Sequence, residues 1–229
     1  MKKYGRNEVL LCAAVVLVCM LAACATYQSR NVTPTTFLGD YSMLKEGGEG
    51  RARLLYINPQ ADFKAYTAIM MDPVKLYASG KHEMDKLTPE DRQKILNYAD
   101  AAIRQQLAKD YKLVNTAGPG VARLRTAITE AEDANVTLDT ISTVVPIGLA
   151  LSGLVALGTG EWAFTGSVGV EAEMLDSVTG KRLFAAVDRR TGAKVTGEGD
   201  KFNDWRTVKN AFDFWAAKLR ERLAEERAK

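Results

Sequence analysis

The stretch of sequence that decides the fold spans residues 164–190 and reads FTGSVGVEAEMLDSVTGKRLFAAVDRR. Its first part alternates between apolar residues on one side and acidic residues on the other, namely Val168, Val170, Ala172 and Met174 against Glu171 and Glu173. Because successive side chains of a strand point to opposite faces, this pattern predicts a strand with one apolar face. Turn residues follow at 177–181, so residues 182–190 predict the returning strand of a β-hairpin.

Further strands are predicted upstream of this hairpin. Residues 52–57 form one apolar run, and residues 66–77 form a second that Pro73 interrupts. Proline cannot donate to a strand ladder, so we expect an edge position or a bulge there. Residues 111–115 and 121–129 are also strand-like, and the Gly118-Pro119-Gly120 turn between them predicts a hairpin-like connection.

Two helices are predicted around these strands. Thr88 as N-cap, Pro89 at the first helical position and an apolar period indicate a helix that ends near Lys109. A last helix over residues 204–226 carries an apolar stripe made of Trp205, Val208, Phe212, Trp215, Leu219 and Leu223. The elements together predict an α+β domain, a mainly antiparallel sheet with helices packed largely on one face.

The N-terminus has the three parts of a secretory signal. Positive charges come first, an apolar core of 13 residues runs from Val9 to Leu21, and Leu21-Ala22-Ala23-Cys24 closes it. A membrane-spanning helix needs about 20 apolar residues, so an uncleaved membrane helix is the weaker alternative. We expect removal of residues 1–23, lipidation of Cys24, and a polar tether over 24–36 before a single domain at 37–229.

Composition narrows the chemistry of the mature chain. Removing the leader leaves 206 residues with 28 basic and 27 acidic side chains, a balance that indicates no nucleic-acid partner. Cys12 and Cys19 lie in the leader and Cys24 is the predicted lipidation site, so disulfides and thiolate chemistry are excluded. His82, the single histidine, has no second ligand nearby, and we predict no metal and no cofactor.

Glu171 and Glu173 are the residues most easily taken for catalytic acids, because glycoside hydrolysis uses paired carboxylates. Their place on one strand face instead predicts exposed side chains that pair with Arg189 and Arg190 across the hairpin. We therefore expect a solvated sheet face, with no catalytic residue in the chain.

One segment does not fit the pattern of the predicted strands and helices. Residues 141–160 carry no charge and contain four glycines among apolar residues. A buried helix or crossover is the plainer interpretation, since Pro146 leaves the run short of a membrane span. The sharper interpretation is a surface that packs against an envelope protein, a second copy of the chain or the membrane, through Ile147, Leu149, Leu151, Leu154, Val155 and Leu157.

Short motifs along nearly the whole mature chain resemble one bacterial lipoprotein family, catalogued as domain of unknown function 3313 (DUF3313). They are Phe37-Leu38-Gly39-Asp40-Tyr41, Tyr56-Ile57-Asn58-Pro59, Asp72-Pro73-Val74, Gly118-Pro119-Gly120, Val144-Val145-Pro146, Glu171-Ala172-Glu173 with Asp176 and Thr179-Gly180, Val187-Asp188-Arg189-Arg190, and Trp215 with Leu219. The resemblance implies a lipoprotein but brings no activity or cofactor. Lipoproteins with Asp after the modified cysteine tend to stay in the inner membrane. Ala25 stands there, so we expect the outer membrane, facing the periplasm.

These observations favour a non-enzymatic role, a binding or assembly component of the cell envelope held to the membrane by its lipid anchor. Two alternatives stay open. A carrier of an apolar ligand would need an internal cavity lined by residues 141–160. An envelope hydrolase would use acids such as Glu171, Glu173 or Asp188.

Overall fold

The computed structural model describes residues 26–29, 32, 34–77, 88–132, 167–192 and 205–229. Its centre is the predicted hairpin, formed by β8 (Ser167–Asp176) and β9 (Arg182–Gly192) in antiparallel pairing. The turn is closed by Asp176, whose Oδ1 accepts the backbone N–H of Thr179 at 2.7 Å. Gly180 has φ +72°, which glycine adopts without the clash that a Cβ brings. The hairpin prediction is confirmed.

The described residues form one nine-stranded sheet in the order β2-β3-β9-β8-β7-β4-β6, with β1 also beside β9 and β5 beside β7. The remaining strands are β1 (Thr26–Gln28), β2 (Lys45–Glu46), β3 (Leu54–Ile57), β4 (Ala68–Met71), β5 (Lys75–Leu76), β6 (Lys112–Val114) and β7 (Val121–Glu132). Five pairings are antiparallel, and β4 and β5 supply the parallel ones. The mainly antiparallel α+β fold is confirmed.

The predicted hairpin between β6 and β7 is wrong. β4 lies between them and pairs in parallel with both, so that Ala68 faces Lys112 on one side and Val121 on the other. β6 and β7 therefore run in the same direction, and the segment with the glycine and proline returns the chain to the level at which β6 began. Pro73 lies between β4 and β5, both of which pair with β7. The proline therefore occupies a break between two short strands and not an edge strand.

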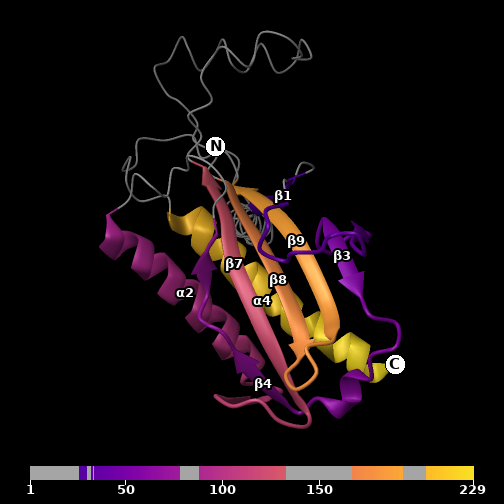
Figure 1. The fold of residues 1–229 in the computed structure, drawn as a ribbon. Coiled ribbons are helices and arrows are strands. Elements are labelled where there is room, and N and C mark those ends of the chain that lie inside the picture. The colour runs from indigo at the N-terminus through magenta and orange to yellow at the C-terminus, as the bar shows by residue number, and fades with distance from the viewer. Residues whose placement is uncertain (1–25, 30–31, 33, 78–87, 133–166, 193–204) are drawn as a thin grey trace, which may run out of the picture.

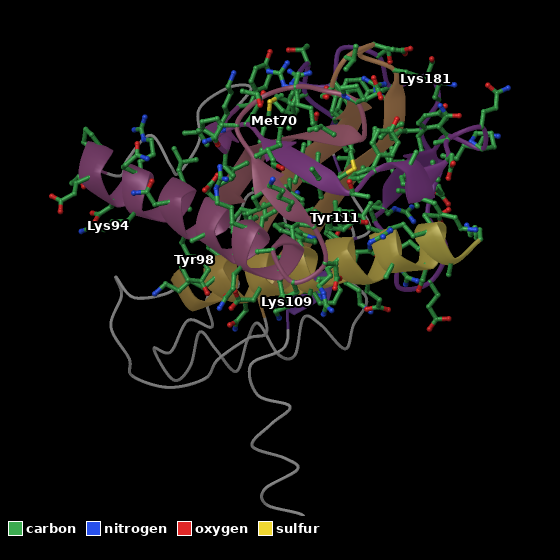
Figure 2. All side chains as sticks on the ribbon, turned by 90° about the horizontal axis from the view of Figure 1, so that it is seen from below. Met70, Lys94, Tyr98, Lys109, Tyr111 and Lys181 are labelled. Atoms are coloured by element: carbon green, nitrogen blue, oxygen red, sulfur yellow. The ribbon has the colours of Figure 1, made fainter. Side chains whose placement is uncertain are left out.

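Two long helices lie side by side on one face of the sheet, as Figures 1 and 2 show from two directions. They are α2 (Pro89–Leu107) and α4 (Trp205–Ala228), and the short helix η1 spans Phe63–Ala65. The Thr88 side chain accepts the N–H of Asp91 at 3.1 Å, which confirms the predicted helix start. The main core lies between the helices and the sheet and includes Ile69, Leu107, Leu124, Ile128 and Phe212.

The opposite face is covered by the N-terminal part of the chain. Phe37 and Leu38 are buried there against Ala127, Ala185 and Val187. Within the described part of the predicted tether, β1 pairs with the end of β9 and Thr35 is buried, so these residues lie against the sheet. An extended polar segment can pair with the free edge of a strand through its backbone. A sequence pattern without apolar residues gives no sign of such pairing.

Several predictions fall outside the described residues: the signal peptide, the lipidation of Cys24, His82 and the uncharged segment at 141–160. They stay predictions. Of the helices that the structure describes, none is long and apolar enough to span a membrane.

Candidate functional site

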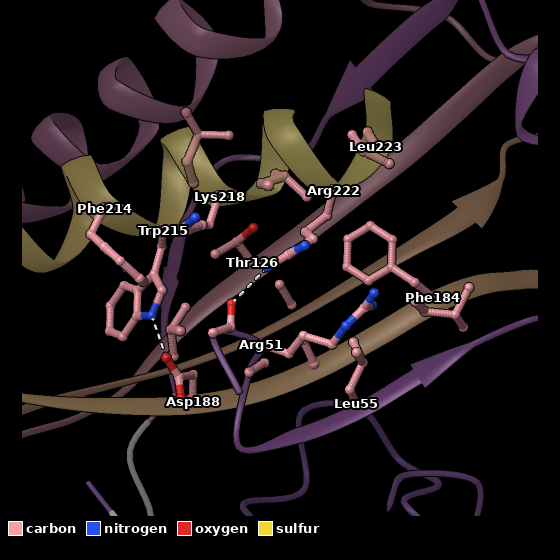
Figure 3. A pocket seen from close by; sticks show the side chains of 18 of the residues that line it. Arg51, Leu55, Thr126, Phe184, Asp188, Phe214, Trp215, Lys218, Arg222 and Leu223 are labelled. Atoms are coloured by element: carbon pink, nitrogen blue, oxygen red, sulfur yellow. Dashed lines mark hydrogen bonds between the residues drawn. The ribbon is translucent and has the colours of Figure 1, made fainter. Parts of the chain in front are cut away.

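A pocket of about 350 Å³ lies between α4 and the sheet. Figure 3 shows α4 above it and the strands below. Its volume lies within the range of roughly 300–1,000 Å³ that small-molecule sites occupy. Most of the lining is apolar, from Leu55, Ile57, Phe63, Ile103, Val170, Ala172, Phe184, Ala186, Phe212, Phe214, Trp215, Leu219 and Leu223.

The pocket exists because small side chains meet in one row of the sheet. Leu55 faces Ala186 across β3 and β9, and Ala186 faces Ala172 across β9 and β8. The neighbouring pair on the same face is larger, with Phe184 opposite Met174. Two single-carbon side chains therefore leave space beneath α4, which the bulkier rows hold away from the sheet.

Asp188 closes one end of the pocket and is 4% exposed. Its Oδ2 accepts the indole N–H of Trp215 at 2.7 Å, the contact drawn as a dashed line in Figure 3. Its Oδ1 accepts the Gln28 side-chain amide at 2.7 Å and the Arg53 N–H at 3.1 Å. Three donors hold this carboxylate in place, which compensates its burial and ties β1, the residue before β3, and α4 to β9.

Basic side chains gather on the rest of the polar lining. Arg190 lies with its guanidinium carbon 3.7 Å from the centre of the Phe214 ring, and burial lowers the pKa of Arg190. Arg222 donates to Glu225 at 2.6 Å and to the Gly50 carbonyl at 3.1 Å. The hydrogen bond with Glu225 raises the pKa of Arg222, so its positive charge persists. The arrangement offers an apolar cavity with a basic rim.

Glu171 and Glu173 lie on the other face of the sheet, and the prediction of exposed side chains is wrong, since they are 0% and 2% exposed. The predicted pairing with Arg189 and Arg190 is also wrong, because the register sets Val187 opposite Glu171 and Ala185 opposite Glu173. The N-terminal segment covers both carboxylates, and its position could not be read from the hairpin alone.

Both carboxylates are fully engaged where they lie. Glu171 accepts the Thr35 N–H at 2.6 Å and the Tyr41 hydroxyl at 2.5 Å. Burial, and then the hydrogen bond to Glu171, raises the pKa of Tyr41 to about 12. Glu173 pairs with Arg125, and it also accepts the Nε–H of Arg182 at 2.9 Å. The structure thus separates these two acids from Asp188 by the thickness of the sheet.

Sequence reasoning singled out Asp188 but missed the pocket beside it. Alternation along β8 and β9 places Ala172 and Ala186 on the apolar face, yet their meeting in one row depends on strand register. Within the described residues, no group of three or more histidines, cysteines, aspartates or glutamates could hold a metal ion.

The fold and the pocket define a class of protein: an α+β domain with one sheet and a non-polar cavity under its C-terminal helix. A family model described as "Protein of unknown function (DUF3313)" matches residues 33–219. The chain belongs to this family, which confirms the resemblance carried by the sequence motifs.

One relative is the uncharacterized lipoprotein YdcL of Escherichia coli strain K12, 29% identical over 191 residues that cover 81% of this chain and 85% of that protein. Among solved structures, the dodecamer of PelC from Paraburkholderia phytofirmans is 11% identical, with 74% of this chain and 94% of that chain covered and a TM-score of 0.34. Lipoprotein GNA1162 from Neisseria meningitidis is 13% identical, with coverages of 69% and 99% and a TM-score of 0.32. Likenesses this distant say nothing of function.

Proposed function

We propose that this chain is a non-enzymatic binding lipoprotein of the outer membrane, facing the periplasm, and that an apolar ligand occupies the pocket under α4. The observation that carries the proposal is the cavity of about 350 Å³ over Ala172 and Ala186. Removing apolar ligand surface from water contributes about 25 cal/mol per Å², so an apolar pocket of this size favours an apolar ligand. The predicted leader and a relative described as a lipoprotein support the anchor, and Ala25 supports the outer membrane.

The positions of the acids support a role without catalysis. Asp188 lies at the pocket, but hydrogen bonds from Trp215, Gln28 and Arg53 occupy both of its oxygens. A general acid or base must instead reach a proton of the substrate. Glu171 and Glu173 lie beneath the N-terminal segment on the far face. These carboxylates therefore do not converge on a common reacting atom.

The cavity also supports the alternative of a ligand carrier. Its lining in the described chain comes from residues outside 141–160, the segment that the sequence had suggested. The assembly role stays a prediction, because it depends on that uncharged segment. Cross-linking from Leu151 or Val155 in whole cells, at native expression, would test it. Recovery of only unlinked monomer would count against assembly and leave the pocket proposal unchanged.

The pocket is tested with an uncharged apolar fluorophore, N-phenyl-1-naphthylamine, titrated into protein bearing Cys24→Ser so that no acyl chain of its own competes. We expect saturable fluorescence enhancement. Ala186→Phe places an aromatic ring on the pocket floor and should weaken binding at least tenfold. The matched control is Val178→Phe at the hairpin tip, where the native side chain is 63% exposed. Equal binding by all three proteins would refute the proposal.

The anchor has a separate test. Mass spectrometry of the mature protein should show an N-terminus at Cys24 carrying acyl chains, and fractionation of the envelope should place the protein with the outer membrane. An unmodified N-terminus would exclude the anchor without touching the pocket.

A further inference from the structure

We propose that the pocket selects a single-chain anionic amphiphile, with its acyl chain over Ala172 and Ala186 and its anionic head between Arg51 and Arg222. This inference rests on the proposed function and adds the chemical class of the ligand. Three observations carry it: the charge balance of the lining, an unmet donor on Arg222, and the weak pairing of Arg51.

The charged residues of the lining favour an anion. Four of those in the described chain are basic and two are acidic: Arg51, Arg190, Lys218 and Arg222 against Asp188 and Glu226. Asp188 accepts hydrogen bonds from three neutral donors, and Glu226 pairs with the Lys229 ammonium at 2.7 Å. Among the bases, Lys218 pairs with Glu221 and Arg222 pairs with Glu225, whereas Arg51 has only a long ion pair. The lining therefore has a net excess of positive charge, which favours an anionic head over a cationic one.

Arg222 has a donor for which the described residues supply no acceptor. Its two terminal nitrogens bond Glu225 and the Gly50 carbonyl, whereas its Nε–H is buried without a hydrogen-bond partner in the described part of the chain. Buried N–H groups are nearly always bonded, and Arg222 belongs to the pocket lining, so we infer that a ligand oxygen reaches this group after a small shift of the side chain. An oxygen of a carboxylate or phosphate would satisfy it.

Arg51 is the second cation of this head-group position. Its side chain is 32% exposed, and its ion pair with Glu225 is long, at 3.9 Å. Glu225 is bonded more closely by Arg222, so one carboxylate faces two guanidinium groups. Figure 3 shows Arg51 and Arg222 reaching the pocket from opposite sides, one from the segment before β3 and the other from α4. Guanidinium groups bind planar carboxylate and phosphate oxygens through paired hydrogen bonds.

The test is displacement of N-phenyl-1-naphthylamine from the Cys24→Ser protein by amphiphiles of equal chain length. Dodecanoate, 1-dodecanol and dodecyltrimethylammonium share twelve-carbon chains and differ in the charge of the head. We expect dodecanoate to displace the fluorophore at about tenfold lower concentration than dodecanol, because one charge-assisted hydrogen bond contributes about that much affinity. The cationic compound should be the weakest competitor. A lysophosphatidylglycerol arm distinguishes a phospholipid source from a free fatty acid.

Variants separate the head-group contact from the cavity. Arg222→Met and Arg51→Met should each remove most of the preference for dodecanoate while leaving dodecanol unchanged. Arg220→Met is the matched control, because Arg220 lies on the same helix but pairs with Asp110 at 2.7 Å, away from the lining. If Arg222→Met does not fold, Arg51→Met on the other side of the pocket still decides the matter.

The outcomes distinguish this inference from the function on which it rests. Binding of dodecanol and dodecanoate with equal strength would overturn the anionic head group and leave the apolar pocket standing. Equal losses for both compounds in Arg222→Met and Arg51→Met would overturn it as well. Failure of the fluorophore and of dodecanol to bind at all would overturn the proposed function itself.

Discussion

The two faces of the central hairpin are covered in different ways, and adjacent residues of β9 show the difference. Ala185 is fully buried against Phe37 and Leu38, which come from the N-terminal segment. Ala186 points to the other face and lies on the floor of the pocket under α4. An irregular segment can follow the contour of the sheet and fill small gaps, whereas a straight helix is kept at a distance from the sheet by its largest side chains. The same small residue is therefore core on one face and cavity on the other.

The two faces also differ in how their buried polar groups are paired. On the N-terminal face, Glu171 and Glu173 have partners on both oxygens. On the pocket face, the Nε–H of Arg222 is unmet within the described chain. The face under the N-terminal segment pairs its two buried carboxylates and so contributes stability, whereas the face under α4 leaves open volume that is suited to a ligand. This contrast predicts that substitutions on the first face change stability and that those on the second change binding.

The largest effect is expected from Glu173→Ala. The carboxylate is 2% exposed and holds Arg125 and Arg182, so its removal leaves two cations without their shared partner. Loss of one member of a buried pair costs about 3–5 kcal/mol, and the partial exposure of the arginines places our expectation near the lower end. Urea unfolding followed by circular dichroism measures the change.

A surface pair provides the control for this substitution. Glu46 pairs with Arg53 at 2.8 Å, but its side chain is 72% exposed, so Glu46→Ala should change the free energy of unfolding by less than about 1 kcal/mol. Comparable losses for Glu46→Ala and Glu173→Ala would contradict the structural role given to the N-terminal face. In each variant that folds, binding of N-phenyl-1-naphthylamine should be retained.

The second prediction compares the same substitution, alanine to phenylalanine, at the neighbouring residues Ala185 and Ala186. Ala185→Phe inserts a ring where the space is filled, and overpacking of this kind costs about 1–3 kcal/mol. Ala186→Phe inserts the same ring into open volume and should leave the unfolding free energy within about 1 kcal/mol of the native value. Thermal and urea unfolding of both variants tests the pair. Equal destabilisation would mean that the cavity does not exist in solution.

The sequence was sufficient for the longer elements, whose patterns are local. Alternation predicted the β8–β9 hairpin, and the Thr88-Pro89 start predicted α2. Long-range pairing was the limit. β4 lies between β6 and β7 because three separate segments meet, and the turn at Gly118-Pro119-Gly120 carries no information about the inserted strand.

The same limit applies to the candidate site: residue types could be predicted from the sequence, but their surroundings could not. Asp188 could be singled out as an acid, but its role as an acceptor for Trp215 depends on the packing of α4 over β9. Glu171 and Glu173 were assigned to the correct strand face and to the wrong environment, because nothing in β8 itself shows that the segment at Thr35 returns to cover them. Register and coverage, and not residue type, decide which acids are exposed.

The smallest effect is expected at Tyr41. Its hydroxyl donates to Glu171 at 2.5 Å, and Tyr41→Phe should cost about 1 kcal/mol near neutral pH. The folded-state pKa of Tyr41 is raised to about 12, above the ordinary value of 10.0, so its contribution is complete below pH 10 and is lost as the pH rises toward 12. The difference in stability between native protein and Tyr41→Phe should therefore shrink over that range, as urea unfolding at several pH values would show. Tyr98, whose pKa is raised similarly but whose bond to Asp213 is exposed, is the comparison, and Tyr98→Phe should cost less. A Tyr41→Phe difference that stays constant with pH would show that the hydroxyl is not held by Glu171.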